Sequence, residues 1–109
     1  MKSFTLTLML AFAAGSVTAY TAYAAQVSIS QKGKTFSQTE LTVKKGDVIM
    51  FVNDDAVTHN VMSASSGNAF NLGAQAPGAS LPYTFNSVGE TMITCAIHPT
   101  MKLKVTVAN

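Results

Sequence analysis

Apolar and polar residues alternate along most of the chain from Gln26 onward, and no stretch shows the spacing of three and four residues that marks an amphipathic helix. The clearest alternation begins at Met101, where apolar residues at every second position are separated by lysine and threonine. Residues 48–52 are apolar on both sides, which is typical of a central strand. The pattern therefore predicts an all-β protein.

Eight segments carry the strand pattern, and turn residues such as Gly, Asp and Asn separate most of them. They span residues 27–30, 41–44, 48–52, 57–61, 69–72, 81–85, 91–95 and 101–107. Because two half-apolar sheets bury their apolar faces by covering each other, we expect a Greek-key β-sandwich of seven to eight strands. The uncharged connection 63–80, which contains the short segment 69–72, is expected to wrap an edge of this sandwich.

Residues 1–24 have the pattern of an export signal. Lys2 precedes an apolar stretch, residues 4–14, and small residues follow up to the predicted cleavage site before Ala25. The apolar stretch is shorter than the ~20 residues that cross a bilayer, so we expect no membrane anchor in the mature protein. The prediction is a periplasmic protein in which residues 25–109 form a single domain.

Composition narrows the possible functions. Only 11% of the residues are charged, arginine is absent and the formal net charge is +2, so no nucleic-acid partner is expected. The chain offers no pair of acids and no nucleophile with an adjacent base, and Asp54-Asp55 is interpreted as part of a turn. We therefore expect a protein that is not an enzyme.

Four potential metal donors stand out. Cys95, His98 and Met101 lie within one short segment, and His59 lies 36 residues before the cysteine. One thiolate, two imidazoles and a thioether together favour copper, whereas structural zinc usually takes four thiolate or imidazole ligands. If Cys95 ends one strand and Met101 begins the next, the connection between them can fold three donors around one ion. His59 must then come from another strand.

Each donor also has a purely structural interpretation. His59 lies between two valines and can be a core histidine, and Cys95 can be a small buried hydrophobe. Met101 continues an apolar strand face, and His98 can be a loop residue without a chemical role. A single metal site is favoured because it uses both histidines and the only cysteine of the chain, and a lone cysteine in an exported protein has no partner for an internal disulfide.

These motifs resemble the cupredoxins, the type 1 blue copper proteins, and most closely their amicyanin and plastocyanin-like group. The resemblance covers nearly the whole predicted mature chain and is strongest in residues 41–47, 51–53, 59–61 and 95–101. It implies one type 1 copper ion with three equatorial ligands and one axial ligand, in the order His59, Cys95, His98 and Met101. It also implies that Asn60 ties the ligand-bearing strands together.

The resemblance implies a one-electron carrier that cycles between Cu(I) and Cu(II). Its partners would be a redox donor and acceptor, such as a cytochrome or a dehydrogenase, and a small diffusing carrier is expected to be a monomer. A second hypothesis is a periplasmic copper-handling or tolerance protein that binds or delivers copper without a role in a redox chain. A third is a metal-free binding module, which a copper titration would distinguish.

An apolar docking face is expected around His98, the ligand predicted to lie at the solvent edge. Ala96, Ile97 and Pro99 are its nearest apolar neighbours in the sequence, and the uncharged loop 70–77 is expected to complete it. Redox partners use small interfaces that release quickly, which suits an apolar patch of limited area.

Overall fold

The computed structural model describes residues 25–109, so the predicted signal peptide lies outside the described part of the chain. The described residues form nine strands and no helix, which confirms the all-β class. The strands are β1 (Gln26–Lys32), β2 (Thr35–Phe36), β3 (Glu40–Lys44), β4 (Val48–Asn53), β5 (His59–Ser63), β6 (Phe70–Gln75), β7 (Ser80–Thr84), β8 (Gly89–Thr94) and β9 (Lys102–Ala108). The additional strand is β2, whose two residues are too few to show a period.

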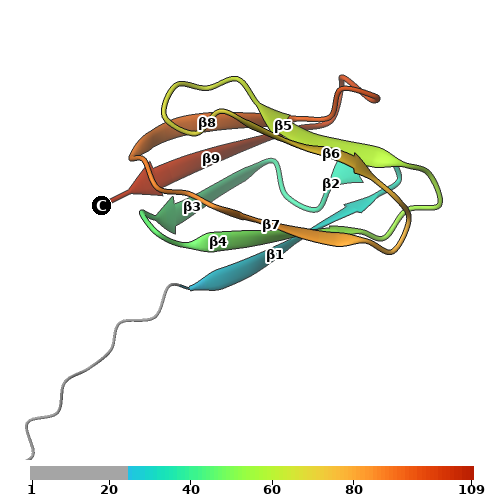
Figure 1. Cartoon of the computed structure of the whole chain (residues 1–109), viewed down its shortest axis with the longest axis horizontal. Coiled ribbons are helices and arrows are strands. Elements are labelled where there is room, and N and C mark those ends of the chain that lie inside the picture. The colour runs from blue at the N-terminus through green and yellow to red at the C-terminus, as the bar shows by residue number, and fades with distance from the viewer. Residues whose placement is uncertain (1–24) are drawn as a thin grey trace, which may run out of the picture.

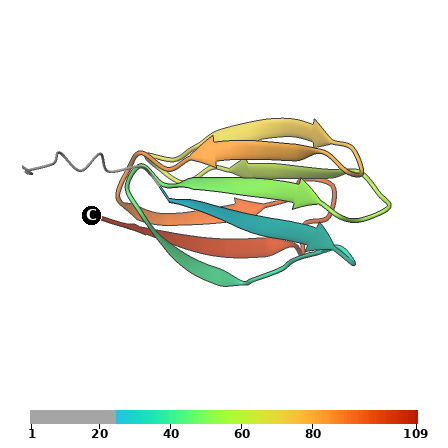
Figure 2. The same cartoon turned by 90° about the horizontal axis from the view of Figure 1, so that it is seen from below.

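The strands form two sheets that lie face to face (Figures 1 and 2). One sheet has the order β2-β1-β4-β7 and the other has the order β3-β9-β8-β5-β6. The chain passes from one sheet to the other in the connections β2–β3, β3–β4, β4–β5, β6–β7 and β7–β8, which gives the predicted Greek-key sandwich. β4 lies between β1 and β7, so the prediction of a central strand at residues 48–52 is confirmed.

The core lies between the two sheets, on the faces that the alternation pattern assigned to the interior. In β9 the residues Leu103, Val105 and Val107 are buried, while the intervening residues are half-buried or exposed. Phe51 and Phe85 are the largest fully buried side chains. This packing supplies most of the apolar burial that stabilises such a small sandwich.

The strand predicted at residues 57–61 begins later than expected. β5 starts at His59, and Val57 is 38% exposed in the connection before it. His59, Asn60 and Val61 are all buried in succession, and the register against β6 shifts between Asn60 and Met62. Such a β-bulge turns consecutive side chains away from strict alternation.

The expectation that residues 70–77 form an apolar docking loop is wrong for most of the segment. Residues up to Gln75 belong to β6, an edge strand that pairs with β5. Phe70 stacks on Tyr83 with ring centroids 3.7 Å apart, and Leu72 packs against the core. The apolar side chains of β6 therefore complete the sandwich, as the expected edge position of the 63–80 connection requires.

Three connections meet at one end of the sandwich. The β8–β9 connection lies at the end opposite the C-terminus, and the β1–β2 turn and the β4–β5 connection lie at this same end (Figure 1). Among the described residues, no helix has the length and hydropathy needed to cross a membrane.

Removal of one buried methyl group tests the core assignment. Ile49 in β4 is fully buried, whereas Ile97 in the β8–β9 connection is 51% exposed. Ile49→Val should lower the free energy of unfolding by about 1 kcal/mol, since a buried Ile→Val change costs about 0.5–1.5 kcal/mol. The same change at Ile97 should alter it by less than about 0.5 kcal/mol. Urea denaturation of the metal-free variants measures both values, and equal losses would contradict the assignment.

Candidate metal centre

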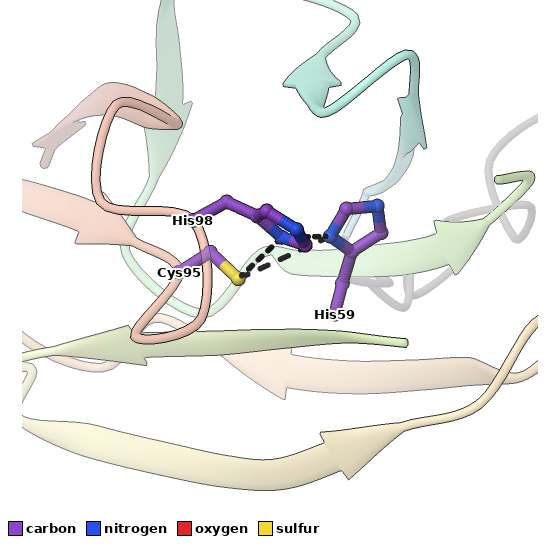
Figure 3. A group of neighbouring side chains, drawn as sticks. All are labelled: His59, Cys95 and His98. Carbon is purple, nitrogen blue, oxygen red and sulfur yellow. Dashed lines mark hydrogen bonds between the residues drawn. The ribbon is translucent and has the colours of Figure 1, made fainter. Parts of the chain in front are cut away.

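Three of the four predicted donors lie together at the end of the sandwich where the connections meet. The Nδ1 atoms of His59 and His98 are 3.2 Å apart. The Sγ atom of Cys95 lies 4.0 Å from Nδ1 of His59 and 3.9 Å from Nδ1 of His98. Figure 3 shows the two imidazole rings meeting at their Nδ1 atoms, steeply inclined to each other, with the Cys95 sulfur beside them. Residues 36 positions apart in the sequence therefore share one small volume.

Two neighbouring strands position these donors. His59 is the first residue of β5, and Cys95 directly follows β8, which pairs with β5 through Met62 and Thr94. The segment from Cys95 then turns back toward β9, and the peptide N–H of Met101 donates to the carbonyl of His98 over 2.9 Å. The predicted connection with a donor at each end is present, although β8 ends one residue before Cys95.

Burial differs among the donors. His59 and Cys95 are 0% and 1% exposed, whereas His98 is only half-buried. Met101 is buried just before β9 and belongs to the core cluster. His98 is thus the donor nearest the solvent, and the assignment of Met101 as an axial ligand stays a prediction.

Asn60 links the two segments that carry the donors. Its peptide N–H donates to Sγ of Cys95 over 3.2 Å, and its Oδ1 accepts the N–H of Ala96 over 3.2 Å. Its Nδ2 donates to Oδ1 of Asn71 and to the carbonyl of Gly73. A peptide N–H directed at the sulfur stabilises the negative charge that a metal-bound thiolate carries. Asn60 thus makes the strand-tying contacts that the family resemblance implies.

Asp55 is a further residue at the site, and the sequence predicted it only as part of a turn. The carboxylate Oδ2 lies 2.9 Å from Nε2 of His59, on the side of the ring opposite Nδ1. The backbone N–H of Lys34, and next the His59 ring, hold the pKa of the Asp55 carboxyl well below its usual range. The only signal in the sequence is a carboxylate four residues before a candidate ligand.

A second polar group supports the connection that carries Asp55. Nδ2 of the buried Asn53 donates to the carbonyls of Val57 and Gln75, both over 2.9 Å. Oδ1 of Asn53 accepts the N–H of Asp55, which closes a turn around the start of the connection. The turn chemistry predicted for these residues is present, and it holds Asp55 beside the histidine.

The donor triangle fits a metal ion. Its sides are 3.2, 3.9 and 4.0 Å, so a point equidistant from the three atoms lies about 2.2 Å from each of them. Zinc, which is adjacent to copper in the periodic table, makes bonds of roughly 2.0–2.3 Å to imidazole nitrogen and thiolate sulfur. One thiolate and two imidazoles in a trigonal arrangement are the strong ligands of blue-copper sites. The residues present therefore suit copper.

Comparison with known proteins identifies the family. The model of the copper binding proteins of the plastocyanin/azurin family matches residues 23–108. The methylamine utilization protein MauL of Methylorubrum extorquens is 30% identical over an alignment of 109 positions that covers 94% of this chain and 90% of that protein. The chain belongs to the plastocyanin/azurin family. The predicted cupredoxin resemblance and the predicted cofactor, copper, are confirmed by this membership.

Solved structures share the fold of this cupredoxin. The Cu(I) form of an amicyanin variant is 27% identical with a TM-score of 0.70, covering 80% of this chain and 85% of that chain. A purple cupredoxin from Nitrosopumilus maritimus is 23% identical with a TM-score of 0.67, covering 75% and 99%. A copper-containing nitrite reductase from Thermus scotoductus is 24% identical with a TM-score of 0.73, covering 86% of this chain and 25% of that larger chain.

Loss of the Asn60 side chain should loosen the connection after β8. In the metal-free protein, Asn60→Ala should lower the free energy of unfolding by about 1–3 kcal/mol, because partly buried hydrogen-bonding groups lose their partner. It should also speed hydrogen exchange at the Ala96 amide, measured by NMR. Asn71→Ala is the control, since it removes one partner of Asn60 and leaves the bond to Ala96 in place. Equal exchange at Ala96 in both variants would contradict this role for Asn60.

Proposed function

We propose that this cupredoxin is a one-electron carrier whose copper is held by His59, Cys95, His98 and, axially, Met101. The observation that carries the proposal is the convergence of two imidazoles and the only cysteine on one small volume. Bound copper would supply a Cu(I)/Cu(II) couple. The three donor atoms surround one point about 2.2 Å from each of them, and this arrangement suits a bound copper ion that exchanges electrons.

Contacts within the chain hold two of the donors in place. His59 is held from behind by Asp55, and Cys95 receives the N–H of Asn60. Because both are buried in a closely packed core, the protein has little freedom to rearrange them when the charge at the site changes. Small rearrangement between two charge states is the physical requirement for rapid electron transfer.

A redox partner would approach at His98. It is the only donor of the three that is not fully buried, and the exposed residues Ala96, Ile97 and Pro99 flank it in the sequence. Val57, on the connection before His59, is another large apolar side chain at the surface. A small apolar face suits a short-lived encounter, in which an electron moves before the partners separate.

The proposed location is the periplasm, and the proposed partners are a donor and an acceptor among redox proteins, such as a cytochrome or a dehydrogenase. The leader-like residues 1–24 support export. The likeness to a methylamine utilization protein and to amicyanin supports a partner in a redox chain. We propose a monomer, because a carrier that serves two partners in turn must leave the same face free.

Substitution of the cysteine tests the ligand set. Cys95→Ser should abolish the intense visible absorption of the copper-loaded protein, because that band arises from charge transfer between thiolate and Cu(II). Met101→Gln should retain a coloured site with a lower reduction potential, since a harder axial oxygen favours Cu(II). Thr100→Ser, in the same connection but without a donor role, should keep the parent spectrum. A full visible band in Cys95→Ser would overturn the assignment.

Electron exchange distinguishes a carrier from a copper-handling protein. We expect reversible voltammetry and rapid electron self-exchange, measured by NMR line broadening in mixtures of the reduced and oxidised protein. We also expect slow loss of Cu(I) to a competing chelator, because two of the donors are buried. Slow electron exchange together with rapid transfer of Cu(I) would instead support copper delivery.

A further inference from the structure

We propose that Asp55 is a positioning residue of the copper site: its carboxylate fixes the ring of His59 so that Nδ1 is the metal-binding nitrogen, and its negative charge lowers the reduction potential. This inference rests on the proposed function and deepens it. In the sequence, Asp55 is predicted only as an acidic residue of a turn. In the structure, it contributes no atom to the donor triangle.

The hydrogen bond to Asp55 selects one tautomer of the His59 ring. Nε2 lies 2.9 Å from Oδ2 of Asp55, and the ring is fully buried. An ionised carboxylate only accepts hydrogen bonds, so Nε2 of the neutral ring must carry the proton. Nδ1 then has the free electron pair, and it is the atom that faces Nδ1 of His98 and Sγ of Cys95. The carboxylate therefore prepares the ring for a metal on the opposite side.

The Asp55 side chain is itself held from several directions. Oδ2 also accepts the N–H of Lys34 over 2.9 Å, and Oδ1 accepts the N–H of Ala56 over 3.0 Å. Lys34 lies in the turn between β1 and β2, where Gly33 and Lys34 both have positive φ, 63° and 59°. Two successive positive φ values are typical of the tight type I′ hairpin. The hairpin thus acts on His59 through the carboxylate, although it contributes no ligand.

The charge at Asp55 is only partly screened by solvent. Its side chain is 17% exposed, and it contacts a ring that is fully buried. A negative charge behind a ligating imidazole makes the ring a stronger donor and favours the more highly charged metal ion. The expected consequence is preferential stabilisation of Cu(II) over Cu(I), and hence a lower reduction potential.

Asp54 offers a matched control in the adjacent position. It is exposed, and its Oδ2 accepts the hydroxyl of Ser30 over 2.6 Å. Asp54→Asn therefore removes the same charge from the same turn while leaving the contact between Asp55 and His59 in place. If Asp55→Asn changes the properties of the copper site and Asp54→Asn does not, the change is due to the contact with the His59 ring and not to the net charge of the protein.

The first experiment uses the metal-free chain and does not depend on copper. The ¹⁵N chemical shifts of the His59 ring, measured by NMR near neutral pH, should show the proton on Nε2 in the parent chain and in Asp55→Asn, whose amide oxygen can still accept it. In Asp55→Ala a detectable population with the proton on Nδ1 is expected. A proton on Nδ1 in the parent chain would overturn the positioning role, whether or not the protein binds copper.

The second experiment uses the copper-loaded protein. Asp55→Asn, which keeps the acceptor and removes the charge, should raise the reduction potential. Asp55→Ala, which also removes the hydrogen bond, should weaken Cu(II) binding by about 10–100-fold, the usual effect of losing a hydrogen-bonding partner of a metal ligand. Asp54→Asn should change Cu(II) affinity by less than about threefold. Equal shifts of the reduction potential in Asp55→Asn and Asp54→Asn would overturn the electrostatic role of Asp55. Failure of the parent chain to bind copper would overturn the proposed function as well, while the ring-proton measurement still decides the positioning of His59.

Discussion

Asn60 joins the two segments of chain on which the copper site depends. Its backbone N–H contacts the Cys95 sulfur, its Oδ1 binds the next peptide of the same connection, and its Nδ2 binds two groups of β6. Because Asn60 is adjacent to His59, these bonds set the distance between a predicted ligand on β5 and a predicted ligand after β8. The bulge in β5 makes this possible, since it lets His59, Asn60 and Val61 all turn inward in succession.

The site combines a fixed side with a side that reaches the surface. His59 and Cys95 are buried and come from neighbouring strands of one sheet, so the core that stabilises the sandwich also restrains them. His98 lies on the connection between β8 and β9 and is half-buried. A rigid interior limits rearrangement, and the proposed redox partner would approach at the half-buried His98.

The negative charge beside His59 is held by connections of the other sheet. The β1–β2 turn and the β4–β5 connection together place a carboxylate behind His59, where the Lys34 N–H stabilises its charged form. The donors themselves belong to the segments around β5 and β8, so both layers of the sandwich contribute to the centre. A substitution in the β1–β2 turn would therefore affect the site through the Asp55 carboxylate, although no predicted ligand lies in this turn.

The sequence by itself determined the all-β class, the inward face of β9 and the identity of the donor types. Alternation with period two is the direct consequence of burying one face of a strand, so Leu103, Val105 and Val107 were assigned correctly. Strand β2 escaped detection because two residues carry no period. β5 was placed too early because Val57 belongs to the connection before it, where the Val57 carbonyl accepts Nδ2 of Asn53 and the side chain is exposed. Only the tertiary structure decided that His59 meets Cys95 and that Asp55 faces a ring and not water. Both facts depend on contacts between distant segments, including the Lys34 N–H that reaches Asp55 across 21 positions of the sequence, and no local pattern of residues encodes them.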